Sequence, residues 1–367
     1  MKRILVPAMA IATTTAFAGD FKFNLESRFD LVNAKMTTTG VTEKYNNFAN
    51  GVVRLNMVGS VNENLSYRFR IRFMKGAPAP IVNSGLGTAS SAREESGTQI
   101  DYLYVEHKMP WMSLRLGKQN WAEAMGRETF AAATDVFIGS QAFADYKAGA
   151  GSDYRAGLSA IFKPEGFGTF TLALSNPNTL LTDNTGTTAT NSAIAYGAFY
   201  NGSFMDKMIQ PVVSYQVLPQ EGDSDLAASS RVKKGNFTSM AVGARSEMFG
   251  ATLDLDYKTF KKANRNDGTN TSAVETTTKS IQANVSYDLG MFVPVVTYVN
   301  DKFKSETTTA LYKKTSFAVG TYIKPFENTN FRYHVMYTSA KKEADGAGST
   351  VATTKDNRFL VGFKADF

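Results

Sequence analysis

Three arginines at alternate positions are the residues of this chain whose type and spacing point most directly to chemistry. Arg68, Arg70 and Arg72 alternate with Phe69 and Ile71. On a strand, side chains two positions apart lie about 6.6–6.8 Å apart on one face, so the three guanidinium groups would form a basic ladder. A ladder of fixed positive charge orients dipolar solutes and sorts ions by sign.

Residues suited to catalysis or metal binding are scarce. The chain has no Cys and two His, His107 and His334, which excludes a disulfide scaffold and a Cys nucleophile and leaves little for a zinc site or a His-based dyad. Asp254 and Asp256 alternate with apolar residues, but nothing nearby suggests a paired-carboxylate catalytic site. No G-x-S-x-G, HExxH or P-loop spacing occurs. We therefore expect no catalytic residue, no metal and no cofactor.

The N-terminus predicts export. A basic start is followed by a short apolar stretch and by Ala16-Phe17-Ala18, which has the A-x-A form of a signal-peptidase site. We expect residues 1–18 to be a cleaved signal peptide and residues 19–367 to be the mature, single domain. The mature chain has only a mild positive charge, so nucleic acid is not an expected partner. No later segment has the run of about 20 apolar residues that a membrane helix needs.

Hydrophobicity along the mature chain has a period of two. At residues 21–31 the odd positions are apolar except Ser27, and every even position is polar or charged. The same alternation recurs at 65–74, 281–289, 331–338 and 358–367. A period of two predicts strands with one apolar and one polar face.

The connections between these strands alternate in length. Seven short turns lie near residues 62–64, 109–111, 164–168, 201–207, 249–250, 290 and 325–330. Eight long polar loops span 35–46, 75–97, 122–152, 177–190, 219–235, 262–278, 300–313 and 340–353. Fifteen connections imply sixteen strands.

These features together favour a membrane barrel over a soluble sandwich. An even number of strands, short turns at one end and long loops at the other are typical of transmembrane β-barrels. The apolar face must then be the outer one, and a sixteen-stranded barrel is too wide for side chains to fill. Lumenal charges therefore contact water, and aromatic residues near strand ends fit interfacial girdles.

The chain resembles the Gram-negative outer-membrane porins. The resemblance rests on the signal ending at Ala18, a first strand that starts at Phe21, the sixteen-strand rhythm, the stretch Ser113 to Gln119, and a final strand that ends on Phe367. It implies a bacterial outer-membrane location, a homotrimer, a lipid environment, and Phe367 as the signal for the barrel-assembly machinery. It also implies that the third long loop, 122–152, folds into the barrel. The expected fold is an all-β, sixteen-stranded antiparallel transmembrane barrel with short periplasmic turns and long external loops.

Strand parity and this resemblance together predict a constriction with two charged sides. Arginines on the lipid face would each cost about 2–4 kcal/mol near the midplane, so the ladder should face the lumen. The expected basic wall consists of Lys22, Arg28, Arg54, Arg68, Arg70, Arg72 and Arg115. The expected acidic edge on the inward loop consists of Glu123, Glu128, Asp135 and Asp145.

The function that follows is passive diffusion of small hydrophilic solutes and ions through a water-filled channel. One alternative is a channel selective for anions such as phosphate, because the arginine ladder is basic. Another is a barrel hydrolase, which the scarcity of His disfavours. A third is a plugged structural or adhesive barrel.

Overall fold

A computed structural model describes most of the chain. The described residues are 21–75, 99–121, 125–129, 138–150, 154–176, 180–182, 188–190, 194–220, 234–265, 274–306, 311–327, 329–346 and 349–366. The predicted signal peptide and the candidates Glu123, Asp135 and Phe367 lie outside them.

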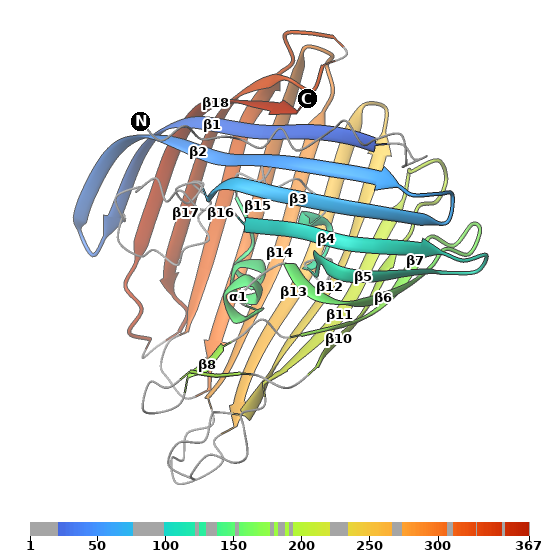
Figure 1. Cartoon of the computed structure of the whole chain (residues 1–367). Coiled ribbons are helices and arrows are strands. Elements are labelled where there is room, and N and C mark those ends of the chain that lie inside the picture. Colours follow the sequence, from blue (N-terminus) through green and yellow to red (C-terminus); the bar gives the residue numbers. More distant parts are fainter. Residues whose placement is uncertain are drawn as a thin grey trace, which may run out of the picture.

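Sixteen strands form one closed barrel in which every neighbouring pair is antiparallel (Figure 1). The barrel strands are β1 (Phe21–Thr38), β2 (Val41–Ser60), β3 (Leu65–Lys75), β4 (Gln99–Lys108), β5 (Ser113–Asn120), β6 (Tyr154–Phe162), β7 (Thr169–Ser175), β10 (Ala195–Asn201), β11 (Gln210–Gln220), β12 (Lys234–Met248), β13 (Ala251–Arg265), β14 (Val274–Tyr287), β15 (Phe292–Ser305), β16 (Tyr312–Ile323), β17 (Arg332–Ala344) and β18 (Thr354–Asp366). A separate small sheet joins β8 (Leu180–Thr182) and β9 (Thr188–Thr190). The predicted all-β, sixteen-stranded antiparallel barrel is confirmed.

The two faces of the strands differ as the alternation predicts. On β13, Leu255 and Tyr257 are exposed on the outside, whereas Asp256 and Lys258 point inward and are buried. A soluble protein would reverse this arrangement, because broad apolar surfaces are not left in water. The outer face is therefore built for lipid. In the described residues, no helix is long and apolar enough to cross a membrane.

The short turns lie at the predicted positions. One joins β14 to β15, where Lys324 from the next turn donates a hydrogen bond to Asp288 at 2.9 Å. That bond and the backbone N–H of Gly290 hold the pKa of Asp288 below its ordinary value. The small stabilisation from this exposed pair is therefore present at neutral pH and is lost as the pH falls through that lowered pKa.

The first long loop was predicted wrongly. We expected a loop over 35–46, but β1 and β2 continue through it and meet at a tight turn of Thr39 and Gly40. Both residues have positive φ, 47° and 88°, which is the conformation of a type I′ turn whose twist matches that of its strands. The polar Thr-rich sequence, which we interpreted as a loop, forms a strand because Thr has a good β-propensity.

The barrel closes where β1 pairs with β18, and one glycine makes that seam possible. Gly362 on β18 pairs with Asp30 on one side and with His334 of β17 on the other. Across it, His334 Nε2 lies 2.6 Å from Asp30 Oδ1. Arg28 Nε donates to Asp30 Oδ2 at 2.9 Å, and all three side chains are buried. A β-carbon at Gly362 would stand in the path of the Asp30–His334 bond.

Gly362→Ala is therefore expected to destabilise the barrel by about 1–3 kcal/mol, the usual cost of overpacking. The added methyl would lie 2.6 Å from Asp30 Oδ1 and 2.7 Å from His334 Nε2. The measurement is the temperature at which the folded band disappears in SDS electrophoresis. Ser316→Ala is the matched control, because Ser316 also lies in the barrel wall, is fully buried, and its Oγ makes no hydrogen bond within the described chain. Equal transition temperatures for the two variants would contradict the role of Gly362.

Candidate functional site on the inner wall

Three of the predicted arginines converge on one carboxylate. Arg54 of β2 and Arg70 and Arg72 of β3 place nitrogens 3.7, 3.2 and 3.0 Å from the oxygens of Asp101 on β4. The Asp101 side chain is fully buried. We call Arg54, Arg68, Arg70, Arg72 and Asp101 the arginine cluster. The structure thus brings most of the predicted ladder together on the inner face of β2–β4.

Three β-bulges on neighbouring strands set the direction of these side chains. The pairing skips Gly51 on β2, Phe73 on β3 and Asp101 on β4. An extra residue bends a strand and redirects the side chains beside it. Strict alternation with Tyr102 and Tyr104 would send Asp101 outward, so sequence reasoning missed it. One feature of the sequence could have revealed it: alternation places the acid Asp101 on the lipid-facing side, where a charge is costly, so a bulge at this position was to be expected.

Tyrosine rings hold the guanidinium groups in place. Arg68 and Arg70 lie 4.1 and 4.2 Å from the ring centre of Tyr102, and Arg70 also lies 5.2 Å from that of Tyr154 and hydrogen-bonds its hydroxyl. Cation–π contacts of this kind strengthen when partly desolvated. Arg68 also donates to Asn56 at 2.9 Å. The cluster is therefore a rigid stack rather than a row of mobile side chains.

The cluster carries excess positive charge. Three of its four arginines contact Asp101, the fourth, Arg68, donates to Asn56, and Glu26 adds a second carboxylate 3.3 Å from Arg54. The remaining predicted basic residues lie elsewhere: Arg28 pairs with Asp30, and Arg115 pairs with Glu106 at 2.8 Å. Lys22 is exposed near the start of β1. The basic wall is thus a compact cluster with separate ion pairs around it.

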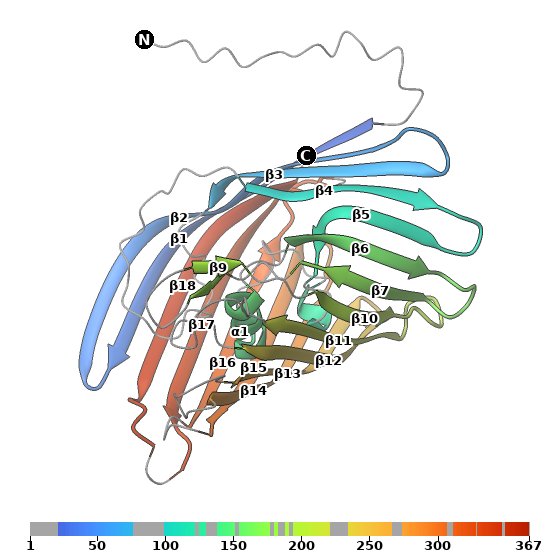
Figure 2. The ribbon, with the colours of Figure 1, turned by 60° about the horizontal axis from the view of Figure 1, so that its bottom comes forward.

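The third long loop lies inside the barrel. Its described parts include the 3-10 helix η3 (Arg127–Thr129) and the helix α1 (Gln141–Ala150). Figure 2 shows α1 surrounded by the barrel strands. Met125, Phe143 and Tyr146 of the loop are buried against a lumen-facing apolar patch. That patch consists of Ala195, Leu218, Phe237 and Phe260 on β10–β13.

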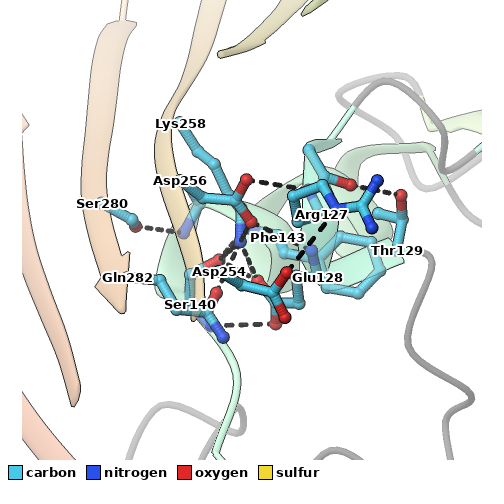
Figure 3. A network of polar contacts seen from close by, with 12 residues as sticks. Arg127, Glu128, Thr129, Ser140, Phe143, Asp254, Asp256, Lys258, Ser280 and Gln282 are labelled. Carbon is cyan, nitrogen blue, oxygen red and sulfur yellow. Dashed lines mark hydrogen bonds and ion pairs between the residues drawn. The ribbon is translucent and has the colours of Figure 1, made fainter. Parts of the chain in front are cut away.

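A buried polar network fastens η3 to β13 (Figure 3). Asp256 accepts the backbone N–H groups of Arg127 and Glu128 at 2.8 and 3.0 Å. Glu128 forms an ion pair with Lys258, whose Nζ also donates to Gln282 at 2.6 Å. The side chains of Glu128 and Lys258 are both 0% exposed. Asp254 and Asp256 therefore face inward as parity predicts, and Asp256 holds the loop.

A second set of contacts fastens α1 to β14 and β15. The first N–H groups of the helix, at Gln141 and Ala142, donate to Asp301 and Ser280 at 2.9 and 3.0 Å. Such side-chain acceptors satisfy helix N–H groups that have no partner within the helix. Asp145 accepts a hydrogen bond from Thr278.

The loop acids that the structure describes anchor the inward loop to the barrel wall. We expected Glu128 and Asp145 to form an acidic edge opposite the arginines, but Glu128 is buried against Lys258 and Asp145 bonds Thr278 and Gln141. The reason is that the wall behind the loop supplies cations and donors, which the local sequence of the loop does not reveal. The other two candidates, Glu123 and Asp135, lie outside the described residues.

Comparisons with solved structures identify this architecture. The outer membrane channel DcaP of Acinetobacter baumannii is similar over 95% of this chain and 97% of its own, with a TM-score of 0.68 and 12% identity. OmpT of Vibrio cholerae in a trimer form is similar over 95% of this chain and 100% of its own, with a TM-score of 0.61 and 13% identity. OmpF of Salmonella typhi in complex with daunomycin covers 95% and 97%, with a TM-score of 0.55 and 13% identity.

Comparisons by sequence find less: no family model matches the chain, and no curated protein matches it. Its likeness to known proteins is therefore a likeness of fold, carried by the closed barrel and its lipid-facing surface. The chain has the closed, sixteen-stranded antiparallel barrel fold of the bacterial outer-membrane porins.

Proposed function

We propose that this barrel is a passive diffusion channel for small hydrophilic solutes, with a preference for anions. The observation that carries the preference is the arginine cluster, in which four guanidinium groups outnumber the two nearby carboxylates, Asp101 and Glu26. Fixed positive charge in a narrow, partly desolvated passage raises the local concentration of anions. Of the two described loop acids, Glu128 is neutralised by its ion pair with Lys258, and Asp145 is held against β14 by Thr278, away from the strands β2–β4 that carry the cluster.

Single-channel recording of the refolded protein in a planar bilayer under a KCl gradient tests this proposal. We expect open steps that vary linearly with voltage and a reversal potential with the sign of chloride preference. A reversal potential of the opposite sign would refute the anion preference while leaving the channel intact. A folded protein that gives no steps would refute the channel itself and favour a plugged barrel. Saturation of the current by submillimolar phosphate would instead indicate a specific anion site.

A hydrolase is the less well supported of the candidate functions. The barrel's Asp–His pair is Asp30 and His334, and both side chains are at most 1% exposed. Their hydrogen bond bridges Gly362 in the wall, so the pair has a structural task and no access for a substrate.

We also propose that the barrel assembles as a homotrimer, as the resemblance implies, through the sector formed by the barrel strands β5, β6, β7 and β10. Strands β5, β6, β7 and β10 contain 8, 9, 7 and 7 residues, and three of them are shorter than the ~9–11 residues that a membrane strand needs. Lys118 also lies on the outward face of this sector, between Leu103 and Ala156. A lysine in lipid costs about 2–4 kcal/mol near the midplane, so protein is the better cover.

Single cysteines test the contact cleanly, because the chain has no Cys of its own. Leu172→Cys in the short sector and Val296→Cys on β15 are both half exposed and face outward. With a bismaleimide cross-linker of roughly 10–15 Å reach, we expect covalent oligomers from the Leu172 variant only. Cross-linking of the β15 variant alone would move the contact to the other side of the barrel.

A further inference from the structure

Arg155 on β6 is a buried arginine that lies under the inward loop. It is 1% exposed, and it faces inward, because Ala156 and Leu158 on the same strand are exposed on the outside. Its Nη2 donates to the hydroxyl of Tyr146 on α1 at 2.9 Å. Its Nε and Nη1 have no hydrogen-bond partner within the described chain. Most of the hydrogen-bonding capacity of this guanidinium is therefore unused.

The charge of Arg155 also needs a counter-charge. An arginine stays charged when it is buried, and an isolated buried charge is strongly destabilising unless an opposite charge lies beside it. Arg28 and Arg70 follow this rule, because Asp30 and Asp101 contact them. For Arg155, no carboxylate of the described chain forms an ion pair. Something other than these residues must balance its charge.

Three buried side chains near Arg155 have polar atoms in the same condition. Gln119 on β5 lies directly opposite Arg155, and Ser175 on β7 lies diagonally across from it, opposite Gly157. Gln216 lies on β11. The Nε2 atoms of both glutamines and the Oγ of the serine have no partner within the described chain. We call Arg155, Gln119, Ser175, Gln216 and Tyr146 the donor cluster.

The hydroxyl of Tyr146 holds the donor cluster together. It lies 2.9 Å from Arg155 Nη2 and 2.8 Å from Gln216 Oε1. The amide of Gln216 thus lies within two hydrogen-bond lengths of the guanidinium, although two strands separate β6 from β11. Trp121 closes another side, because its Nε1 donates to the carbonyl oxygen of Arg155 at 2.9 Å and its ring centre lies 5.4 Å from the guanidinium carbon.

The unused atoms of this cluster are nearly all donors. The free nitrogens of Arg155, Gln119 and Gln216 can only donate, and the hydroxyl of Ser175 can donate as well as accept. A water molecule would bring protons of its own that need acceptors, whereas an anion accepts from every donor around it. The donor cluster is therefore suited to an anion.

The surroundings indicate what kind of anion fits. One guanidinium balances one negative charge. Trp121 packs with Ala173 and Phe199 in an apolar cluster beside the site, so an ion that enters must lose most of its water. A small monovalent ion with weak hydration loses that water at lower cost than phosphate or sulfate, which carry more charge.

We propose that the donor cluster binds a single halide ion, which is chloride in the protein's ordinary surroundings. The ion neutralises Arg155 and joins the wall of β5–β11 to α1, since Tyr146 belongs to that helix. It is a structural anion, buried apart from the arginine cluster on β2–β4. This inference does not depend on the proposed channel or on its ion preference.

Trp121 makes the site observable in solution. The chain has two tryptophans, and the other, Trp111, is 66% exposed between β4 and β5. In the full chain with Trp111→Phe, in neutral detergent, the emission comes from Trp121 alone. Bromide, which quenches tryptophan, is titrated against gluconate at constant ionic strength. We expect quenching that saturates and that chloride, but not phosphate, reverses.

Two variants in this background test the assignment to Arg155. Arg155→Gln removes the charge, so bromide should bind roughly tenfold or more weakly, as expected for the loss of hydrogen bonds to a charged group. Arg358→Gln is the matched control, because Arg358 also faces inward but has a carboxylate of its own, with Asp356 at 2.6 Å. It should bind bromide like its parent. Quenching without saturation, reversal by phosphate, or equal binding by both variants would overturn the proposal.

A crystal of the unaltered chain soaked in sodium bromide gives a test that needs no variant to fold. We expect an anomalous peak beside Nε and Nη1 of Arg155, and the absence of a peak there would overturn the proposal. The site and the channel can fail independently. A protein that shows the peak but gives no channel steps would refute the proposed function and support the halide site. Normal channel steps with neither a peak nor saturable quenching would do the reverse.

Discussion

Replacing Arg70 and Arg72 together by glutamine is expected to shift the barrel's ion preference strongly toward cations. The change leaves Asp101 and Glu26 with Arg54 and Arg68, so the positive excess of the arginine cluster disappears. A unit charge 4–8 Å from a permeating ion contributes about 0.5–1 kcal/mol in water, which corresponds to roughly a two- to sixfold change in preference for each charge removed. The measurement is the reversal potential in a KCl gradient.

Asp101→Asn is the counterpart in the same cluster. It removes a negative charge at nearly the same place, so the chloride preference should rise instead of falling. Opposite shifts in the two variants would locate the selectivity at the arginine cluster. A shift in the same direction for both, or none in either, would show that other charges set the selectivity.

Lys258→Met is expected to produce the largest loss of stability among single substitutions in the inward loop's anchor. It leaves Glu128 and Asp256 buried beside one another without their cation. Removing one partner of a buried ion pair typically costs about 3–5 kcal/mol, because the other charge stays desolvated. Since this pair holds the loop in the lumen, the single-channel current should also become noisier.

Two companion variants make the result decisive. Lys258→Met/Glu128→Gln removes both charges of the pair and should recover much of the lost stability, because a neutral amide costs less to bury than an unpaired carboxylate. Lys324→Met breaks the exposed pair with Asp288 and should change stability by less than about 1 kcal/mol. All three are compared by the SDS transition temperature. Equal losses in Lys258→Met and Lys324→Met would mean that the ion pair of Lys258 with Glu128 contributes little to holding the loop.

Local alternation was enough to predict the barrel and the positions of its turns. The alternation within a single strand determines which side chains point outward, as on β13, where Leu255 and Tyr257 alternate with Asp256 and Lys258. Such a signal requires no knowledge of distant residues.

The features that failed prediction depend on partners far along the chain. The bulge at Asp101 is defined by its register against β3, and a sequence period cannot show where one residue is skipped. Glu128 seemed available for the lumen because Lys258, 130 positions later, is what binds it. The hairpin at Thr39 and Gly40 was missed for a different reason, because Thr-rich composition is shared by loops and strands.

The seam between β1 and β18 has a consequence for the time course of assembly. It pairs Glu26 with Asp366. One edge of β1 and one edge of β18 therefore have no hydrogen-bonding partner until the last strand has been added. Contacts between such distant positions form slowly, because the entropy of closing the intervening chain must be overcome first. Until then the chain has two open strand edges, which are templates for aggregation. A newly made chain would therefore need protection of those edges before the barrel closes, and the lumen would come into existence only with the final strand pairing.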